Sequence, residues 1–358
     1  MLAPNLPMRA EDIDAEWVTS ALRTSGHNLT VTNVRIVEVI KGTSTKVRIA
    51  LEYDEAGGAL NLPNAMCVKG GLEDHSERFK TMYADEAFFY GTVGPEIPLN
   101  MPKCYFAGSD PDSWQSLILM EDLVDSKATF CRAQEPFSFD HIHRRMQMLA
   151  GMHARTWECD EIKPGGAWDR FESRFHGPFS SSYMEHYLQP DIWRYYVESP
   201  RGAAVSVDLH DADRMRRALA RLGEIELEEP LCLIHGDTHP GNLYVEADGT
   251  PGFLDCIGGK ACWWLEIAYH IVCACDIATR PKWEGALLSS YLDALSSHGI
   301  DAPDFDTAWL RYRQSLAHAF FIFQINETHF QTESTNTAYN ARIGIAMIEH
   351  DTMRLLDC

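Results

Sequence analysis

The chain contains 358 residues, about twice the length of a common single domain, so two compact regions are expected. Hydrophobic residues make up 45% of the sequence and charged residues 23%, a globular composition that excludes collagen-like, coiled-coil and largely disordered chains. The net charge of −21 would repel a phosphate backbone or an anionic membrane, so neither nucleic acid nor a membrane is an expected partner.

The N-terminal residues contain no apolar stretch of signal-peptide length. The longest strongly apolar stretch, 267–278, contains His270 and Asp276 and is too short to cross a bilayer. We therefore expect a soluble protein of the cytoplasm. Ten cysteines without a CxxC pair are few for a chain of this length, which favours buried free thiols over a disulfide framework.

The first third of the chain has the pattern of a small sheet with a helix. Alternating β-branched residues separated by turns predict an antiparallel meander over 31–69, and strands resume within 103–123. Between them, Asp74 and Glu77 are spaced as a capping box for a helix whose apolar stripe begins at Phe79.

The rest of the chain is mainly helical. Long helices are expected from about residue 137, at 306–331 and at 340–356, whereas the aromatic segment 160–207 has no regular pattern. The apolar segments 231–237 and 242–245 are expected to form a strand pair. A hairpin turn at Asp248-Gly249 then leads into another apolar strand.

The most informative segment is 231–257, in which an apolar strand leads into a loop. Asp237 and Asn242 are separated by four residues, and the hairpin beyond them returns Asp255 at the end of another apolar strand. In phosphoryl transfer, one carboxylate takes or orients the proton of the acceptor hydroxyl, while an amide and a second carboxylate hold magnesium on the nucleotide phosphates. Protein kinases use the same spacing for these groups.

The sequence HGDTHPGN followed by GFLD resembles the aminoglycoside phosphotransferase and choline-kinase-like superfamily of small-molecule kinases. The resemblance implies an α+β, bilobal protein-kinase-like fold. Residues 1–123 would form a small antiparallel-sheet lobe with one key helix, ending in the hinge, and residues 124–358 a large, mainly helical lobe that binds the acceptor. It also implies ATP or GTP and magnesium as cofactors and a small-molecule hydroxyl as the phosphate acceptor.

The same resemblance assigns roles to four residues. Asp237 would be the catalytic base, Asn242 and Asp255 would ligate magnesium, and His235 would brace the catalytic loop. These roles describe a phosphotransferase that acts on an alcohol group.

The chain departs from the superfamily pattern at two places. Cys256-Ile257 stands where many relatives have an aromatic residue or Gln after the metal-binding Asp, and Glu266 stands at the later acid of the usual D-x-A-Y pattern. The longer acid would still brace the catalytic loop, and neither change touches the predicted base or metal ligands. A catalytically silent, nucleotide-binding pseudokinase is an alternative.

Glu86 and Lys69 offer a second indication of a kinase. Glu86 follows Phe79 by seven residues on the apolar helix stripe, so the helix would carry it toward the core, where a bare carboxylate needs a cation. Lys69 ends the apolar strand just upstream, and kinases pair a strand lysine with a helix glutamate so that the lysine can bind nucleotide phosphates. The alternative for Lys69 is a solvated strand end.

The segment 116–123 resembles the hinge of the superfamily. That resemblance implies that Met120 borders the adenine and that the backbone carbonyl of Glu121 and the backbone amide of Leu123 bind its edge. An inner strand that ends in polar residues is the alternative.

The turn 41–46 lies where a phosphate-covering loop belongs, between the first two strands. Its backbone amides and the Ser44 hydroxyl are candidate phosphate ligands. An ordinary hairpin turn is the alternative.

A metal-dependent hydrolase is a rival interpretation. His235 and His239 are four residues apart, with Asp237 between them and Asp255 downstream, which is a set of residue types that binds transition metals. Neighbouring glycines and a proline argue against a helix that would place both histidines on one face. The rival also explains neither Lys69 nor the hinge-like segment.

The sequence indicates the acceptor only as a broad class, which includes aminoglycosides, amino alcohols, sugars, steroids and hydroxyacyl groups. The aromatic segment between 171 and 196 is a candidate cap for an apolar or cyclic alcohol. Six aromatic residues are candidate walls of the acceptor pocket: Trp263, Trp264, Trp309, Tyr312, Phe320 and Phe321. Aromatic residues at helical spacing are more typical of core than of pocket walls, so we expect most of these six to be core.

Overall fold

The computed structural model describes residues 5–358, and its compactness divides the chain into two units. Among the described residues, the first unit contains 5–129 and 244–257, and the second contains 130–243 and 258–358. The two units are defined by compactness, whereas the predicted lobes are defined by what they bind. The predicted lobe boundary at residue 123 therefore stays a prediction.

The first unit is built on a five-stranded antiparallel sheet. Its strand order is β1-β2-β3-β5-β4, so the expected meander of the first three strands is confirmed. The strands are β1 (Val31–Ile40), β2 (Thr45–Tyr53), β3 (Ala65–Gly70), β4 (Cys104–Ser109) and β5 (Ser116–Glu121).

Alternation along β2 separates the two faces of this sheet. Val47, Ile49 and Leu51 are buried in a core that includes Trp17 of α1 (Ala15–Thr24), and the intervening side chains face the other way. One face of the sheet therefore packs against the helical start of the chain. Charged residues such as Lys46 are left for the opposite face.

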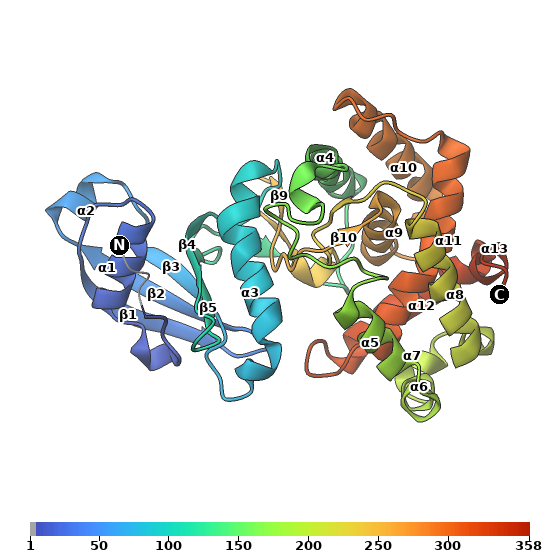
Figure 1. The fold of residues 1–358 in the computed structure, drawn as a ribbon, viewed down its shortest axis with the longest axis horizontal. Helices are drawn as coiled ribbons and strands as arrows, with labels where there is room; N and C mark the ends of the chain where they lie inside the picture. The colour runs from blue at the N-terminus through green and yellow to red at the C-terminus, as the bar shows by residue number, and fades with distance from the viewer. Residues whose placement is uncertain (1–4) are drawn as a thin grey trace. The chain divides into compact units, whose positions relative to one another are not determined.

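Helix α3 (Lys80–Phe88) lies alongside β4 and β5 (Figure 1). The expected capping box is wrong, because α3 begins at Lys80 after a 3-10 turn at Ser76–Phe79 and has no side-chain cap. The Ser76 hydroxyl instead accepts the backbone N–H of Glu73, whereas Asp74 is exposed beside Arg9. The remaining helices of the unit are α2 (Glu55–Ala59), the 3-10 turns Ala10–Asp12 and Gly94–Glu96, and the π-helix Phe89–Val93.

The second unit is mainly helical, with the fully buried helix α9 (Trp263–Ala274) packed on α11 (Phe305–Ile325) and α12 (Glu333–Glu349) (Figure 1). The two expected long helices near the C-terminus exist with shifted ends. A left-handed residue, Asp351, separates α12 from α13 (Thr352–Leu355). The other long helices are α4 (Phe139–Thr156), α8 (Ala212–Glu226) and α10 (Arg280–Ser297).

The aromatic segment without a clear pattern forms three short helices. They are α5 (Pro178–Tyr187), α6 (Pro190–Val197) and α7 (Pro200–Ala203), with 3-10 turns at Asp160–Ile162 and Val207–Leu209. Each of the three begins with a proline, which suits the first helical position because its N–H would have no helical partner there.

The expected pairing of 231–237 with 242–245 is wrong. β7 (Cys232–Leu233) pairs with β10 (Lys260–Ala261), because the backbone N–H groups of Ile234 and Gly258 extend that ladder by bonding to Gly259 and His235. A 3-10 turn at Pro240–Asn242 interrupts the route between the two expected partners. β6 (Thr129–Phe130), β8 (Leu243–Val245) and β9 (Pro251–Phe253) form a separate sheet in the order β6-β8-β9.

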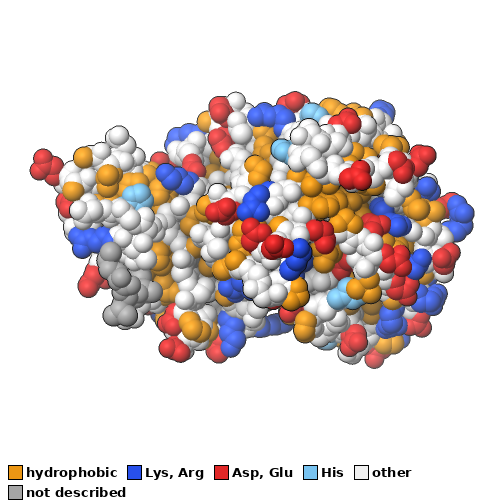
Figure 2. Space-filling view, turned by 45° about the horizontal axis from the view of Figure 1, so that its top comes forward, with side chains coloured by type: hydrophobic (Ala, Val, Ile, Leu, Met, Phe, Trp, Pro, Cys, Tyr) orange, Lys and Arg blue, Asp and Glu red, His pale blue; other side chains and the backbone are white. Residues whose placement is uncertain are grey.

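Within residues 5–358, no helix has the length and apolar character needed to cross a membrane. On the face shown in Figure 2, acidic and basic side chains are interspersed. The surface ion pairs include pairs between residues three apart, such as Arg216 with Asp213.

Candidate functional site

The charged face of the first unit's sheet carries two lysines side by side. Lys46 on β2 lies opposite Lys69 on β3, which in turn lies opposite Ile118 on β5. Cross-strand partners project from the same face of a sheet, so these side chains form one row. Lys69 is buried, and a buried ammonium ion requires anionic partners.

Two carboxylates, those of Glu86 and Asp255, are the anionic partners of Lys69. The Nζ atom of Lys69 binds Glu86 of α3 and donates to Oδ1 of Asp255 at 2.7 Å, and Lys46 donates to the other oxygen, Oδ2, at 3.2 Å. The structure thus brings Lys69 and Glu86 together as the sequence predicts. Asp255 receives one lysine on each oxygen.

Burial and charge act in opposite directions in this cluster. Burial lowers the pKa of Lys69, but Asp255 and Glu86 more than offset it and raise the pKa above its ordinary value. Burial likewise acts to raise the pKa of Asp255, yet Lys46 and Lys69 hold it well below its ordinary value. For Glu86, burial prevails and raises the pKa. Asp255 is therefore an anion with two exchangeable cationic partners.

Asp255 is positioned by the β8–β9 hairpin that precedes it. The backbone N–H of Phe253 donates to the Asn100 carbonyl at 2.9 Å, and the Asn100 side chain donates to Glu246 at 2.7 Å. Asp255 itself adopts φ +58°, in the left-handed region, where the chain turns out of the strand. The hairpin thus presents the carboxylate at a turn.

The predicted phosphate-covering turn connects β1 and β2 in the same unit. The Tyr83 hydroxyl donates to the carbonyl of Thr43, and the ring of His75 donates to the carbonyl of Gly42 at 3.2 Å. Ser44 is partly buried, while the hydroxyl of Thr45 is fully buried with no partner among the described residues. Two side chains therefore hold the turn by its backbone carbonyls, and the Thr45 hydroxyl remains without a partner among the described residues.

The predicted hinge begins at the end of β5. Met120 lies opposite Cys67, so it shares the sheet face of Lys69, and Leu123 is buried in a small cluster with Tyr244 and Leu254 of the hairpin. Glu121 is the last strand residue and is partly exposed. These placements accord with a hinge beside the charged sheet face.

Arg48 forms ion pairs beside the predicted hinge that the sequence did not indicate. Its Nε donates to the buried carboxylate of Asp122 at 2.9 Å, and its Nη1 donates to Glu38 at 2.9 Å. Asp122 also accepts the backbone N–H of Val124 at 3.0 Å, which closes the turn after β5. Arg48 therefore connects β1, β2 and this turn.

In the second unit, β7 leads into the predicted catalytic loop, and Glu266 of α9 holds that loop by its backbone. Oε1 of Glu266 accepts the N–H of Gly236 at 2.8 Å, and Oε2 accepts the N–H of His235 at 3.1 Å. Gly236 has φ +91°, which favours glycine. The longer acid at position 266 thus braces the loop.

Glu266 is itself supported by a buried histidine. His153 of α4 donates to Oε2 of Glu266 at 3.0 Å, and its other ring nitrogen pairs with the Tyr291 hydroxyl at 2.8 Å. Burial acts to raise the pKa of Glu266, but the hydrogen bond and charge of His153 lower it below its ordinary value. The brace is therefore an ionised carboxylate.

The Asp237 carboxylate is surrounded by hydrogen-bond donors. Nδ2 of Asn242 donates to its Oδ2 at 2.8 Å and to its backbone carbonyl at 2.9 Å, and the Tyr269 hydroxyl donates to Oδ1 at 2.7 Å. Nε2 of His239 lies 3.3 Å from Oδ2. Burial acts to raise the pKa of Asp237, but His239 and Tyr269 hold it below its ordinary value.

The histidines of this loop use their rings locally. Nδ1 of His235 accepts the N–H of Asp237 at 3.2 Å, and Nδ1 of His239 accepts the N–H of Gly241 at 2.9 Å. Across residues 5–358, no group of three or more His, Cys, Asp or Glu side chains is arranged to hold a metal ion. The hydrolase interpretation therefore has no histidine-rich metal centre to support it.

Aromatic rings pack beside Asp237. Tyr269 stacks on Phe323 with ring centroids 5.5 Å apart, and Phe323 and His239 each contact Tyr339. The sequence had offered other aromatic residues as pocket walls. Most of them are core, as their spacing indicated, since Trp263, Trp264, Tyr312, Phe320 and Phe321 are buried and only Trp309 is partly exposed.

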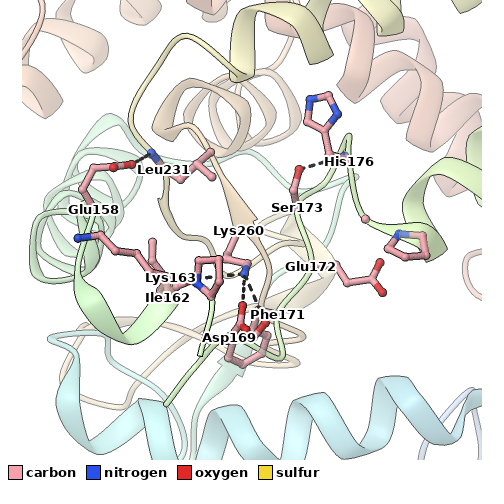
Figure 3. A pocket seen from close by; sticks show the side chains of 13 residues that line it. Glu158, Ile162, Lys163, Asp169, Phe171, Glu172, Ser173, His176, Leu231 and Lys260 are labelled. Carbon is pink, nitrogen blue, oxygen red and sulfur yellow. Dashed lines mark hydrogen bonds and ion pairs between the residues drawn. The ribbon is translucent and has the colours of Figure 1, made fainter. Parts of the chain in front are cut away.

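The second unit also contains a cavity of about 410 Å³ (Figure 3). Phe171 and Leu231 supply apolar wall, and its charged groups pair with one another or with backbone: Lys260 donates to Asp169 at 3.1 Å, and Glu158 accepts the N–H of Leu231 at 2.6 Å. None of the predicted catalytic, metal-binding or cofactor-binding residues lines this cavity.

Sequence reasoning overlooked several partners of the predicted residues. Lys46 lay two residues beyond Ser44, and Tyr269 lay in the same pattern as Glu266, but neither received a role. His239 was a candidate only as a metal ligand, and His153 had no predicted role. Strand register would have found Lys46, because it stands opposite Lys69.

The sequence and the fold both resemble known proteins. The ecdysteroid kinase-like family matches residues 43–257. No curated protein matches the sequence. Many solved structures share the fold, among them two with TM-scores of 0.50. One is a protein from Ralstonia eutropha JMP134, provisionally assigned as an aminoglycoside phosphotransferase, with 14% identity, a TM-score of 0.50, and coverage of 95% of this chain and 97% of that one.

The other is APH(2")-IIia in complex with GDP and kanamycin, with 10% identity, a TM-score of 0.50, and coverage of 94% of this chain and 98% of that one. The expected α+β, protein-kinase-like fold of the small-molecule kinase superfamily is thereby confirmed. Since the family match spans more than half of the sequence, from the turn before β2 to the residues just after Asp255, this chain belongs to the ecdysteroid kinase-like family.

Proposed function

We propose that the protein transfers the terminal phosphoryl group of ATP or GTP to a hydroxyl group of a small molecule in a magnesium-dependent reaction. Membership of a kinase-like family supports the reaction type. One structural neighbour binds GDP and kanamycin, and the family description names ecdysteroids. Kanamycin and ecdysteroids both carry hydroxyl groups, and a hydroxyl is the acceptor group proposed here.

The arrangement around Asp237 carries the proposal. Its carboxylate is ionised, as its lowered pKa requires, and it is oriented by the Asn242 amide and the Tyr269 hydroxyl. An oriented carboxylate accepts a hydrogen bond from the acceptor hydroxyl and receives its proton as the bond to phosphorus forms. Glu266 and His235 hold the backbone of this loop, so the carboxylate is presented in one position.

The charged cluster of the first unit is proposed to bind the nucleotide. Lys69 would exchange its bond to Asp255 for the nucleotide phosphates, while Glu86 keeps the ammonium group in place. Ser44 would contact the phosphates. Met120 and the backbone of Glu121 and Leu123 would contact the base.

Asn242 and Asp255 are proposed as the magnesium ligands. Both offer oxygen atoms, the ligand type that magnesium prefers, and the amide nitrogen of Asn242 is committed to Asp237, which leaves its oxygen as the ligating atom. Asp255 is an anion whose present partners are cations, so it suits a divalent ion in their place. Magnesium, when bound, neutralises charge on the phosphates.

The proposal is tested by replacing Asp237 with Asn or Ala. We expect phosphoryl transfer to an acceptor to fall roughly 100-fold or more, because the general base is removed, while stabilisation of the protein by ATP and magnesium in a thermal-shift assay is retained. Asp213→Asn is a matched control, since Asp213 is an exposed residue paired with Arg216 on α8.

Unchanged phosphoryl transfer in the Asp237 variants would refute the assigned base. A wild-type protein that is stabilised by ATP and magnesium but phosphorylates no alcohol would be the pseudokinase instead.

A further inference from the structure

Helix α5 carries an aromatic stripe that leads from solvent into the second unit. Phe179, Tyr183 and Tyr187 are spaced four residues apart, so they lie on one helix face. Their ring centroids are 5.8 Å and then 4.7 Å apart. Phe179 is 66% exposed, whereas Tyr187 is buried. An apolar ring from solvent therefore has an aromatic surface along which to pack.

A carboxylate lies at the buried end of this stripe. The Tyr187 hydroxyl donates to Oε1 of Glu327 at 2.5 Å, and the ring of His329 lies 3.2 Å from Oε2. The Glu327 side chain is 31% exposed, so solvent or a ligand still reaches it. A carboxylate only accepts hydrogen bonds, so any further partner of Glu327 has to be a donor.

The loop that carries Glu327 is held at both ends. Between α11 and α12, the Asn336 side chain donates to the carbonyls of Asn326 and Gln331 at 3.2 and 3.1 Å. The buried guanidinium group of Arg201 also binds the Asn326 carbonyl. Glu327 is therefore presented by a fixed backbone, which lowers the cost of binding a ligand.

The stripe and Glu327 both lie beside the catalytic loop. Burial raises the pKa of the Tyr183 phenol, and the negative charges of Glu327 and Asp237 raise it further. Tyr187, the next ring of the stripe, donates directly to Glu327. Gln331 connects the two loops independently, since its amide nitrogen lies 3.4 Å from the position that a Cβ atom on Gly241 would occupy.

We propose that Glu327 recognises a second hydrogen-bond donor on the acceptor while Tyr183 and Phe179 pack against the acceptor's ring. The proposal rests on the phosphotransferase function proposed above, in which Asp237 engages the hydroxyl that receives the phosphate. It defines the acceptor class as ring-containing molecules with two separated donor groups. The second donor is a hydroxyl or an ammonium group, since a carboxylate binds either.

Matched acceptors test this recognition. Benzyl alcohol, para-(hydroxymethyl)benzyl alcohol and para-(aminomethyl)benzyl alcohol share one ring and one acceptor hydroxyl but differ in the second donor. Androsterone and androstanediol form a larger pair, in which a ketone replaces the second hydroxyl. We expect kcat/KM of the wild-type protein to be roughly 10-fold or more higher for the two-donor members, because a hydrogen bond to a charged group is strong.

Glu327→Gln and Glu327→Ala should remove most of this preference by raising KM for the two-donor acceptors, with kcat/KM for benzyl alcohol and androsterone unchanged. Glu327→Gln keeps an accepting oxygen but loses the charge, so it should penalise an ammonium group more than a hydroxyl group. Glu185→Gln is the matched control, because Glu185 is an exposed acid on α5.

Equal treatment of one-donor and two-donor acceptors by the wild-type protein would overturn the inference, as would an equal loss for all acceptors in the Glu327 variants. Both outcomes leave the phosphotransferase function intact, since transfer to benzyl alcohol or androsterone still occurs. A wild-type protein that phosphorylates other alcohols but no member of this panel would refute the proposed acceptor class, whereas one that ATP and magnesium stabilise but that phosphorylates no alcohol at all would refute the proposed function.

Discussion

The two units hold their key carboxylates by different means. In the first unit, Asp255 is bound by the ammonium groups of Lys46 and Lys69, and Lys69 is shared with Glu86. In the second unit, Asp237 accepts hydrogen bonds from the Asn242 amide and the Tyr269 hydroxyl beside His239, and a separate carboxylate, Glu266, holds the backbone of its loop.

The lysine partners of Asp255 in the first unit can be replaced by another charged ligand. The hydrogen bonds to Asp237 in the second unit already hold its carboxylate in position. An ion pair with lysine is replaced when phosphates or a divalent ion compete for the same charges. Hydrogen bonds from an amide and a phenol orient a carboxylate without neutralising it. The first unit is thus suited to binding a charged ligand, and the second to presenting a charged group in a fixed position.

The largest expected effect follows from Lys69→Met. The change leaves Glu86 buried without its cation, and breaking a buried ion pair in this way costs about 3–5 kcal/mol of unfolding free energy. Urea unfolding measures the loss, and Lys69→Met combined with Glu86→Leu should recover much of it. Lys163→Met, at an exposed ion pair with Asp160, should leave the free energy of unfolding nearly unchanged. A Lys69→Met protein as stable as that control would contradict the account of a buried charge cluster.

Glu266→Gln should have the next largest effect. The amide supplies one acceptor where two backbone N–H groups and His153 require acceptors, so we expect a loss of about 1–3 kcal/mol. The kcat of phosphoryl transfer should fall while KM for the nucleotide is unchanged, because the nucleotide residues proposed in the first unit are untouched.

Glu224→Gln, at an exposed pair with Arg221 on α8, is the control for Glu266→Gln. A selective rise in nucleotide KM would show that the two regions are not separable in the way described.

Acidification should distinguish the two regions. The folded protein lowers the pKa of Glu266 below its ordinary value of 4.5, so its contribution to stability is present above that value and is lost as the pH falls through the folded pKa. Glu86 has the opposite shift, so the folded protein binds its proton at a higher pH than the unfolded chain does, and the resulting gain in stability is complete once the pH has fallen to about 4.5. As the pH is lowered from neutral, Glu86→Gln should therefore remove a gain in unfolding free energy that occurs above about pH 4.5, whereas Glu266→Gln should flatten the decline below about pH 4.5.

Guanidinium unfolding across that pH range measures both slopes. If unfolding free energy changed with pH in the same way in both variants, the opposite pKa shifts of Glu266 and Glu86 would be contradicted.

The smallest effect is expected for Tyr269→Phe. It removes one donor from Asp237 but leaves Asn242 and His239, so stability should change by about 1 kcal/mol. Loss of the donor raises the pKa of Asp237, so the acid limb of the kcat/KM profile should move to higher pH. Tyr195→Phe, at a residue that is 69% exposed, is the control. An acid limb that does not move would mean that Tyr269 packs beside Asp237 without influencing its ionisation.

Local sequence patterns predicted more of the first unit's cluster than of its surroundings. The apolar stripe of α3 predicted that Glu86 would be buried, and burial of a carboxylate predicted a cation at Lys69. The start of α3 was predicted wrongly, because Asp74 and Glu77 fit a capping box by spacing but Ser76 forms the local turn. Several residue types compete for such a turn, and spacing alone does not decide among them.

Contacts between distant segments were not predictable in this way. Lys46 and Asp255 are 209 residues apart in sequence, and His153 and Glu266 are 113 apart. The partner of β7 was also predicted wrongly, since β10 rather than β8 completes its ladder. Strand pairing over such separations depends on register and on the packing of intervening helices, which leave no local pattern.

The amino-acid sequence by itself determined the residue types of the chemistry and their local geometry: a carboxylate and an amide separated by four residues in a turn, and an acid at the end of a hairpin. These follow from short-range backbone preferences and from apolar periodicity. Only the tertiary structure decided that Lys46 shares Asp255, that Tyr269 binds Asp237 and that Glu327 lies at the end of an aromatic stripe. The physical reason is that these contacts arise when helices and strands pack, and their energies depend on burial that no single segment possesses alone.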